Sequence, residues 1–227
     1  MEKENNIQEI IEYYEVKRFE LEQFLAGVQT FFERHPVLNS KSFPIIHSIK
    51  SRFKDPDHLK VKIVRKFDGN HQIINKNNLF EKINDLIGVR VLHLYHDQFP
   101  AIHAEILKKI ESGDWNFVDS PKAFTWDPES KKQYDDLKII TEIRDTFYTS
   151  VHYVIKPNNN NPVCCEIQVR TLFEEIWGEI DHTINYPQPT TEIACSEQLR
   201  VLSKLVSTGT RLADSIFRTH AHYRNNK

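Results

Sequence analysis

The stretch CEIQVRT at residues 165–171 is followed directly by LFEEIWGEIDH at residues 172–182. Polar and apolar residues alternate in the first segment, which predicts a strand with Glu166, Gln168 and Arg170 on one face. A polar strand face suits a wet binding site, although a face open to solvent explains the same alternation. The second segment has helical spacing. Its predicted buried stripe contains Phe173, Ile176, Trp177, Ile180 and Ile184.

A second strand, FYTSVHYVI at residues 147–155, shows the same alternation, with Tyr148, Ser150 and His152 on one face. The turn-rich KPNNNNP separates it from the strand at residues 163–171, so the two strands are expected to pair antiparallel. With matching faces, an aromatic ring, a carboxylate, an amide and a guanidinium meet in one cleft. Such groups hold a nucleotide: the ring stacks on the base, the carboxylate binds Mg²⁺ and the cation binds phosphate.

A second carboxylate, Asp85, comes directly before a β-branched strand predicted at residues 86–94, which contains Gly88 and Arg90. An aspartate at this position is also a common turn or cap residue. Mg²⁺ in phosphoryl-transfer sites is usually held by one or two carboxylates together with the substrate phosphates. Asp85 and Glu166 are the candidate pair. One turn after Trp177, Asp181 is expected to support Arg170.

Basic residues concentrate upstream of this strand. They are Lys50, Arg52, Lys54, Lys60, Lys62, Arg65 and Lys66. The cluster is either a solvated helix face or a clamp for the phosphates of a polyanionic donor.

The rest of the chain is predicted to be mainly helical around a mixed sheet, which is an α+β arrangement. Helices are expected at residues 5–34, 46–67, 98–112, 172–184 and 196–220, with a short strand near WNFV at 115–118 and a mobile loop at 120–136. The 227 residues, 39% of them hydrophobic and 27% charged, suit one domain with helical extensions.

Charge and cysteine content exclude several classes of protein. The formal net charge of -2 does not indicate a nucleic-acid or membrane partner. Cys164 and Cys165 are adjacent and no zinc spacing occurs, which indicates reduced thiols. The sequence has no apolar leader and no run of apolar residues that would span a membrane. We therefore expect a cytoplasmic protein.

Five motifs together resemble the RelA/SpoT-type (p)ppGpp synthetase domain, the GTP pyrophosphokinases. They are SRFKDPDHLKVK (51–62), DLIGVR (85–90), YTSVHY (148–153), EIQVRT (166–171) and WGEIDH (177–182). The resemblance implies a nucleotidyltransferase-like fold with a mixed sheet. It also implies transfer of the pyrophosphate group of ATP to the 3′-hydroxyl of GDP or GTP, with Mg²⁺ as cofactor. The expected catalytic core covers residues 46–186, between a helix in residues 1–40 and a helical segment at 192–222.

The resemblance also implies roles for individual residues. Asp85 and Glu166 would hold Mg²⁺, and Glu166 would help to deprotonate the attacking hydroxyl. Tyr148 would stack on the guanine of the acceptor. ATP would contact Arg52, Lys54, Lys62 and Arg90. The acceptor nucleotide would also contact Ser150, His152, Gln168 and Arg170.

The sequence departs from the family pattern at one motif. The usual Asn-Gly-Tyr-Arg-Ser is replaced by Thr146-Phe147-Tyr148-Thr149-Ser150, which removes the glycine and the arginine. Another acceptor, the 3′-end of tRNA, therefore stays open, as does a non-catalytic nucleotide-sensing module. No hydrolase motif precedes the synthetase region, so we expect a stand-alone small alarmone synthetase, whose terminal helices offer surfaces for a homo-oligomer.

Overall fold

Six strands form one mixed sheet in the computed structural model, which describes residues 2–70, 73–186 and 188–225. In sequence order they are β1 (Ile46–Phe53), β2 (Ile87–His93), β3 (Asn116–Thr125), β4 (Ile140–Ile143), β5 (Ser150–Lys156) and β6 (Cys165–Thr171). Their order across the sheet is β1-β2-β6-β5-β3-β4. The pairs β2–β6 and β3–β4 are parallel and the other neighbours are antiparallel. The predicted mixed sheet and the antiparallel pairing of β5 with β6 are confirmed.

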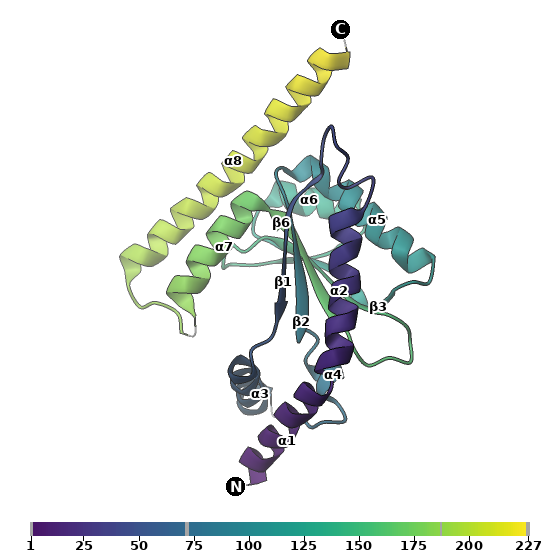
Figure 1. The fold of residues 1–227 in the computed structure, drawn as a ribbon. Coiled ribbons are helices and arrows are strands. Elements are labelled where there is room, and N and C mark those ends of the chain that lie inside the picture. The colour runs from purple at the N-terminus through teal and green to yellow at the C-terminus, as the bar shows by residue number, and fades with distance from the viewer. Residues whose placement is uncertain (1, 71–72, 187, 226–227) are drawn as a thin grey trace.

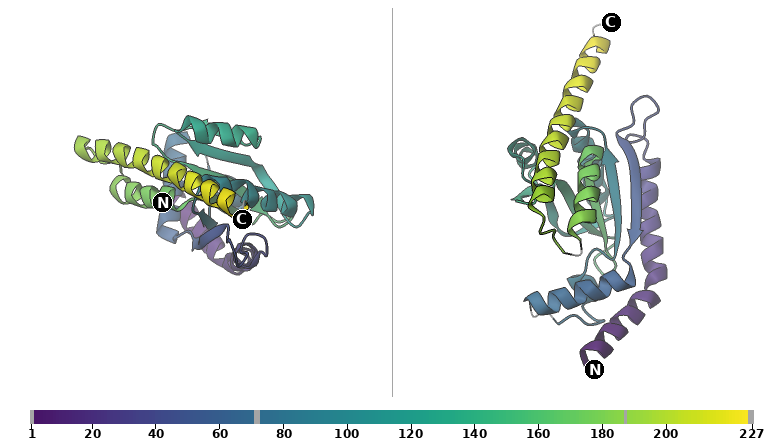
Figure 2. Two further views of the ribbon diagram at one scale, coloured as in Figure 1. Left: turned by 90° about the horizontal axis from the view of Figure 1, so that it is seen from above. Right: turned by 90° about the vertical axis from the view of Figure 1, so that its left-hand side faces the viewer.

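Helices cover both faces of the sheet, which confirms the α+β class (Figures 1 and 2). They are α1 (Glu2–Val16), α2 (Arg18–Arg34), α3 (Pro56–Asn70), α4 (Leu79–Lys82), α5 (Phe99–Glu111), α6 (Pro128–Asp136), α7 (Leu172–Asn185) and α8 (Ile193–Asn225), with a 3₁₀ turn η1 (His96–Gln98). On one face lies α2, and α7 and α8 lie on the other (Figure 2). Among the described helices, none combines the length and the apolar character needed to cross a membrane.

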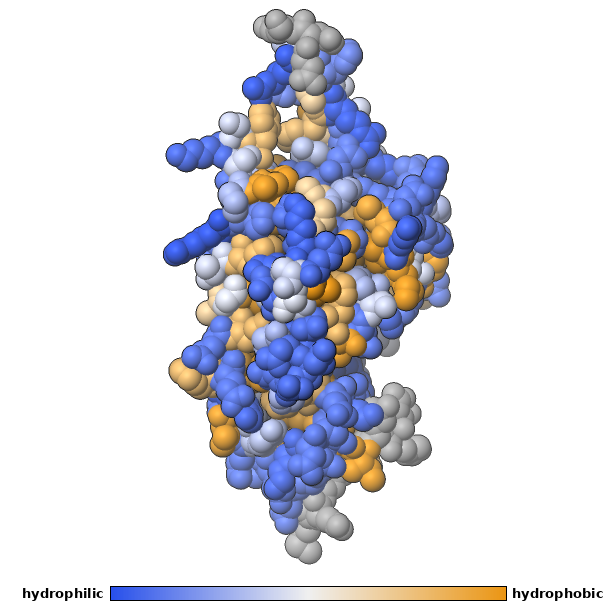
Figure 3. All heavy atoms as spheres, turned by 90° about the vertical axis from the view of Figure 1, so that its right-hand side faces the viewer, coloured by the Kyte–Doolittle hydropathy of each residue, from blue (hydrophilic) through white to orange (hydrophobic). Residues whose placement is uncertain are grey.

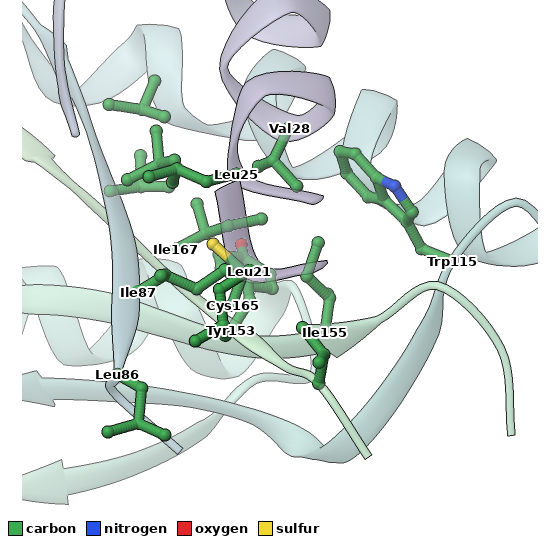
Figure 4. Packing of buried hydrophobic residues seen from close by; sticks show 14 of the residues in the cluster. Leu21, Leu25, Val28, Leu86, Ile87, Trp115, Tyr153, Ile155, Cys165 and Ile167 are labelled. Atoms are coloured by element: carbon green, nitrogen blue, oxygen red, sulfur yellow. The ribbon is translucent and has the colours of Figure 1, made fainter. Parts of the chain in front are cut away.

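The apolar face of the sheet packs against α2 (Figure 4). Leu21, Leu25 and Val28 of α2 point toward Tyr153 of β5 and Ile167 of β6. Because successive strand residues point to opposite faces, the residues next to these in sequence are on the polar face. Burial of the apolar side chains against α2 thus determines which side chains of the central strands lie on the opposite, polar face of the sheet.

The junction between β6 and α7 is closed by a capping box. The Thr171 hydroxyl oxygen accepts a hydrogen bond from the Glu174 backbone N–H at 3.2 Å, and Glu174 Oε2 accepts one from the Thr171 N–H at 2.7 Å. This reciprocal pair satisfies two backbone donors that a helix start would otherwise leave free. The strand therefore turns into the helix without a loop, and α7 lies directly over the polar face of the sheet.

The predicted helix at residues 46–67 is wrong in its first half. Residues Ile46–Phe53 form β1, which pairs antiparallel with β2 and places Arg52 opposite Gly88. The helix α3 starts only at Pro56, where Asp55 Oδ1 accepts the N–H groups of Asp57 and His58 at 2.9 and 3.2 Å. Pairing with a central strand outweighs the helix-like spacing of this segment.

Two other predicted boundaries also change. The helix expected at residues 5–34 is divided at Lys17 into α1 and α2. The loop expected at residues 120–136 instead contains the end of β3 and all of α6. Asp127 caps α6 by accepting the Ser130 N–H at 3.0 Å, and Pro128 occupies its first turn.

The side of the molecule on which α2 and α5 lie is mostly hydrophilic, with hydrophobic residues in separate patches (Figure 3). This distribution agrees with the inward direction of the apolar residues of α2. Phe32 is fully buried in the main cluster, whereas Phe19, on the same helix, is 67% exposed.

We expect Phe32→Ala to lower the free energy of unfolding by about 3–5 kcal/mol, because it removes a large side chain from a closed core. Phe19→Ala is the matched control and should change it by less than about 0.5 kcal/mol. Chemical denaturation measures both. Equal effects of the two substitutions would contradict the packing of α2 on the sheet.

Candidate functional site

The polar face of the sheet is assembled by the register of β6 with its two neighbours. Glu166 lies beside Gly88 of β2 and Val154 of β5, and Gln168 lies beside Arg90 and His152. The predicted matching of polar faces is therefore correct. Gly88 keeps this row close together, since a Cβ at that position would be 3.3 Å from the Glu166 carbonyl oxygen.

A hollow of about 270 Å³ opens over β1, β2 and β6. Its lining includes Arg52, Gly88, Arg90, Glu166, Gln168 and Glu179. Two guanidinium groups and two carboxylates thus share one pocket. Such a set suits a ligand that carries both a planar ring and phosphates, because guanidinium groups stack on rings and bind phosphate oxygens.

Asp85 lies just before β2 and is held by two lysines. The Lys54 Nζ is 2.8 Å from Oδ2, and the Lys62 Nζ is 2.7 Å from Oδ1. Burial raises the pKa of the Asp85 carboxyl, but the two ammonium groups outweigh burial and hold that pKa at about 2. Asp85 is therefore ionised at neutral pH. Burial also lowers the pKa of the Lys54 ammonium below its usual value.

Glu166 is the second carboxylate of the site. The Gln168 amide donates to its Oε2 at 2.7 Å, and the Arg52 guanidinium lies 4.0 Å away. Burial raises the pKa of Glu166, and the hydrogen bonds from His152 and Gln168 more than offset burial, so the pKa lies below its ordinary value. The negative charge of Asp85 raises the same pKa, as expected for two neighbouring carboxylates.

A hydrogen-bonded chain connects Glu166 to the predicted stacking residue. His152 Nδ1 is 3.1 Å from Glu166 Oε1, and His152 Nε2 is 2.9 Å from the Tyr148 hydroxyl. A neutral imidazole with its hydrogen on Nδ1 satisfies both contacts, donating to the carboxylate and accepting from the phenol. Burial raises the pKa of Tyr148, so the phenol keeps its proton.

Two predicted acceptor contacts lie beneath the surface of the site. Ser150 is fully buried, and its hydroxyl is 3.4 Å from the Val169 carbonyl oxygen. Arg170 is 3% exposed, and its Cζ lies 5.8 Å from the centre of the Tyr148 ring. Both residues support the ring and the strand from below. Their predicted contact with an acceptor nucleotide stays a prediction.

The predicted inner face of α7 is wrong. Of its expected stripe only Trp177 is buried, and its indole N–H donates to the Leu199 carbonyl at 3.1 Å. The buried residues of α7 instead include the carboxylates Glu174 and Glu175. A helix that covers a polar strand face must turn its polar side inward, which reverses the usual relation between periodicity and burial.

The supporting partner of Arg170 also differs from the prediction. Asp181 accepts a hydrogen bond from the Asn185 amide at 2.8 Å, and Arg170 forms an ion pair with Glu175. Glu175 and Glu179 also bind Arg90, an interaction that sequence reasoning missed. The one sequence signal was a glutamate pair at i, i+4 on a helix that follows a strand with a polar face.

Comparison with known proteins identifies the family of this chain. The family model described as "Region found in RelA / SpoT proteins" matches residues 51–191, which is more than half of the chain. The chain belongs to the RelA/SpoT family. A search of the curated proteins gave no match.

Solved structures with the same nucleotidyltransferase-like fold include a small alarmone synthetase and a GTP pyrophosphokinase family protein. Small alarmone synthetase 1 from Bacillus subtilis, bound to its product pppGpp, is 20% identical over 89% of this chain and 98% of that chain, with a TM-score of 0.65. The same enzyme bound to AMPCPP is 19% identical over 91% and 99%, with a TM-score of 0.59. A GTP pyrophosphokinase family protein from Streptococcus pneumoniae is 19% identical over 89% and 92%, with a TM-score of 0.68.

Where this chain departs from the RelA/SpoT family pattern, at Phe147, the backbone adopts a strained conformation. Phe147 has a φ of 61°, in the left-handed region that glycine occupies without strain. Its ring packs edge-on against Trp126, with centroids 5.4 Å apart and planes at 74°. The Thr149 hydroxyl is buried 3.1 Å from that of Thr125, so a neutral pair stands where the family has an arginine.

We expect Phe147→Gly to be more stable than Phe147→Ala by about 1 kcal/mol, because both lose the ring but only glycine avoids the left-handed penalty. Denaturant unfolding of the two variants measures the difference. Thr146 is the matched control, since its φ is not positive. There, Thr146→Gly should be less stable than Thr146→Ala by about 0.5 kcal/mol. The same order at both positions would contradict the strain at Phe147.

Proposed function

We propose that this chain transfers the pyrophosphate group of ATP to the 3′-hydroxyl of GDP or GTP, making (p)ppGpp. Family membership supports the reaction class. The Bacillus subtilis structures, one bound to its product pppGpp and one bound to AMPCPP, support these two nucleotide classes as ligands. The proposed substrates are cytoplasmic metabolites, in keeping with the three free cysteines.

One observation carries the proposal: Glu166 lies between the guanidinium pocket and the Tyr148 ring. On one side it contributes to the hollow that contains Arg52 and Arg90. On the other side it is connected through His152 to Tyr148. An ionised carboxylate between a donor pocket and an aromatic ring is suitably placed to act on a hydroxyl group that approaches the donor phosphates.

The donor pocket and its surroundings are rich in positive charge. Arg52 and Arg90 would bind the adenine ring and the phosphates of ATP. Lys54 and Lys62, which form ion pairs with Asp85, would neutralise the phosphates in a loose phosphoryl-type transition state. In the proposed reaction, Tyr148 stacks on the guanine of the acceptor.

The two carboxylates fit a magnesium ion that arrives with phosphates. Oδ1 of Asp85 is buried and accepts no hydrogen bond of normal geometry, although Lys62 is close. Within the described parts of the chain, no group of three or more His, Cys, Asp or Glu side chains forms a metal cage. Asp85 and Glu166 would hold Mg²⁺, which would neutralise charge on the transferred phosphates.

The bond changes balance without another reactant. The 3′-oxygen of the acceptor attacks the β-phosphorus of ATP and forms a new P–O bond. The bond between this phosphorus and the oxygen that bridges to the α-phosphate breaks, and AMP leaves with that oxygen. Glu166 accepts the proton of the attacking hydroxyl.

We expect ATP labelled in its γ-phosphate to label GDP or GTP at the 3′ position, with AMP released in equal amount. Glu166→Gln should lower the rate by about a thousandfold or more, because it removes both the proton acceptor and a metal ligand. Product chromatography measures the transfer. The unfolding curve of the variant serves as the control for folding.

Two other results would overturn the proposal. Label in added tRNA alone would identify tRNA as the acceptor, as the altered motif at Phe147 and Thr149 allows. Absence of label in every acceptor, with nucleotide binding retained, would indicate a sensing module. Asp85 and Glu166 both have pKa values below their ordinary range and are ionised at neutral pH, as the proposed Mg²⁺-dependent transfer requires.

We further propose that α8 joins two copies of the chain. Its buried face contains Leu199, Ser203, Val206, Thr210 and Asp214, and an apolar stripe runs along its exposed side. The exposed apolar residues include Val201, Leu205, Leu212 and Ile216. An exposed apolar stripe that extends from Val201 to Ile216 along a long helix indicates a protein interface.

The spacing of the stripe favours a second copy of this chain as the partner. Val201 and Leu205 are as far before the midpoint at Thr208 and Gly209 as Ile216 and Leu212 are after it. Two such helices that pair antiparallel match Val201 with Ile216 and Leu205 with Leu212 in both directions. A two-fold interface requires this self-complementarity.

We expect a mass of at least twice 26.8 kDa in solution and the monomer mass after Leu205→Gln with Leu212→Gln. Light scattering after size exclusion measures both. Val61→Gln, an exposed apolar position on α3, is the control and should leave the mass unchanged. A monomeric wild-type chain would contradict the proposed interface.

A further inference from the structure

Glu175 of α7 is a buried carboxylate that binds three cations. It is 2% exposed. Its Oε1 is 2.7 Å from Lys50 Nζ and 3.1 Å from Arg90 Nη1, and its Oε2 forms an ion pair with Arg170. Burial raises the pKa of Glu175, but the three cations lower it below its ordinary value, so the group is ionised at neutral pH.

The two guanidinium groups on Glu175 belong to different halves of the site. Arg90 contributes to the hollow of about 270 Å³ that holds the proposed donor. Arg170 lies beneath Tyr148, with its Cζ 5.8 Å from the ring centre, close enough for a cation–π contact that fixes the ring. One carboxylate therefore connects the donor pocket with the residue proposed to stack on the acceptor.

Glu175 is the main polar partner of the buried Arg170 side chain. Its Nε is buried without a hydrogen-bond partner, and Glu175 Oε2 accepts no hydrogen bond of normal geometry. Gly178 provides the space for the guanidinium, because a Cβ there would lie 2.7 Å from Arg170 Nη1. A buried charge that depends on one partner loses its position when that partner is removed.

Two neighbouring residues allow the Glu175–Arg90 contact and the Glu175–Arg170 contact to be perturbed one at a time. Glu179, one turn along α7, binds Arg90 but is half exposed. The three atoms nearest to a Cβ built at Gly178 all belong to Arg170. The chain therefore offers one position that affects the donor side, one that affects the acceptor side, and Glu175, which affects both.

We propose that Glu175 is a positioning residue that holds Arg90 and Arg170 in fixed relation, so that donor and acceptor nucleotides bind in register for transfer. The proposal rests on the proposed function of the site. In this proposal Glu175 does not contact either substrate. Its effect passes through Arg90 to the donor and through Arg170 and Tyr148 to the acceptor.

Four variants test this arrangement by steady-state kinetics with each substrate varied in turn. Glu179→Gln should raise KM for ATP alone. Gly178→Ala, which displaces the Arg170 guanidinium, should raise KM for the acceptor alone. Glu175→Gln should raise both on the order of tenfold and lower kcat, and Glu175→Asp should restore part of the loss.

A purely structural role for Glu175 makes a different prediction. Glu175→Gln would then lower the melting temperature while both KM values stayed at the wild-type level, and this result would overturn the proposal. A rise in only one KM would overturn it as well. If Glu175→Gln does not fold, Glu175→Asp tests the proposal in its place. Wild-type KM values for both substrates in that variant would overturn it.

Direct binding distinguishes failure of this inference from failure of the proposed reaction. Calorimetry with AMPCPP and with GDP measures the two sites without turnover. If the wild-type chain makes no product, the proposed function fails, but Glu175→Gln should still weaken binding of both nucleotides. Unchanged binding of both in that variant would overturn the positioning role by itself.

Discussion

The site depends on the register of β6 between β2 and β5. Side chains alternate along a strand, so a shift of one residue would turn Glu166, Gln168 and Arg170 toward α2 and turn the apolar residues toward the cleft. Burying three charged or amide groups against an apolar helix is far more costly than the native arrangement. Burial of Cys165, Ile167 and Val169 in the core is favourable, and it therefore also determines where the polar residues of the site lie.

A second constraint follows from the helix above this polar face. The capping box at Thr171 starts α7 directly at the end of β6, so the helix lies over charged strand residues. Its inward carboxylates compensate for the guanidinium groups below, and its apolar residues face outward toward α8 and solvent. Buried ion pairs of this kind contribute little net stability compared with apolar packing, but they hold side chains in specific positions.

The sequence was sufficient for the central strands and for the matching polar faces of β5 and β6, because alternation along 147–155 and 163–171 is regular. It was insufficient for β1, whose apolar residues also fit a helix and whose strand conformation comes from pairing with β2. The inner face of α7 was misjudged because helical periodicity shows which face is apolar but not which face meets the sheet. Glu175 was missed for the same reason. The left-handed φ of Phe147 is a tertiary effect that phenylalanine itself does not indicate.

The contact between Trp126 and Phe147 has an evolutionary consequence. The two rings pack edge to face beside the motif in which the RelA/SpoT pattern has a glycine, so a substitution at either position removes a contact of the other. Replacing the phenylalanine first would uncover the indole, and replacing the indole first would leave an unfavourable backbone conformation without its compensating contact. Lineages of this branch should therefore gain or lose the two aromatic residues together, as one linked pair of substitutions.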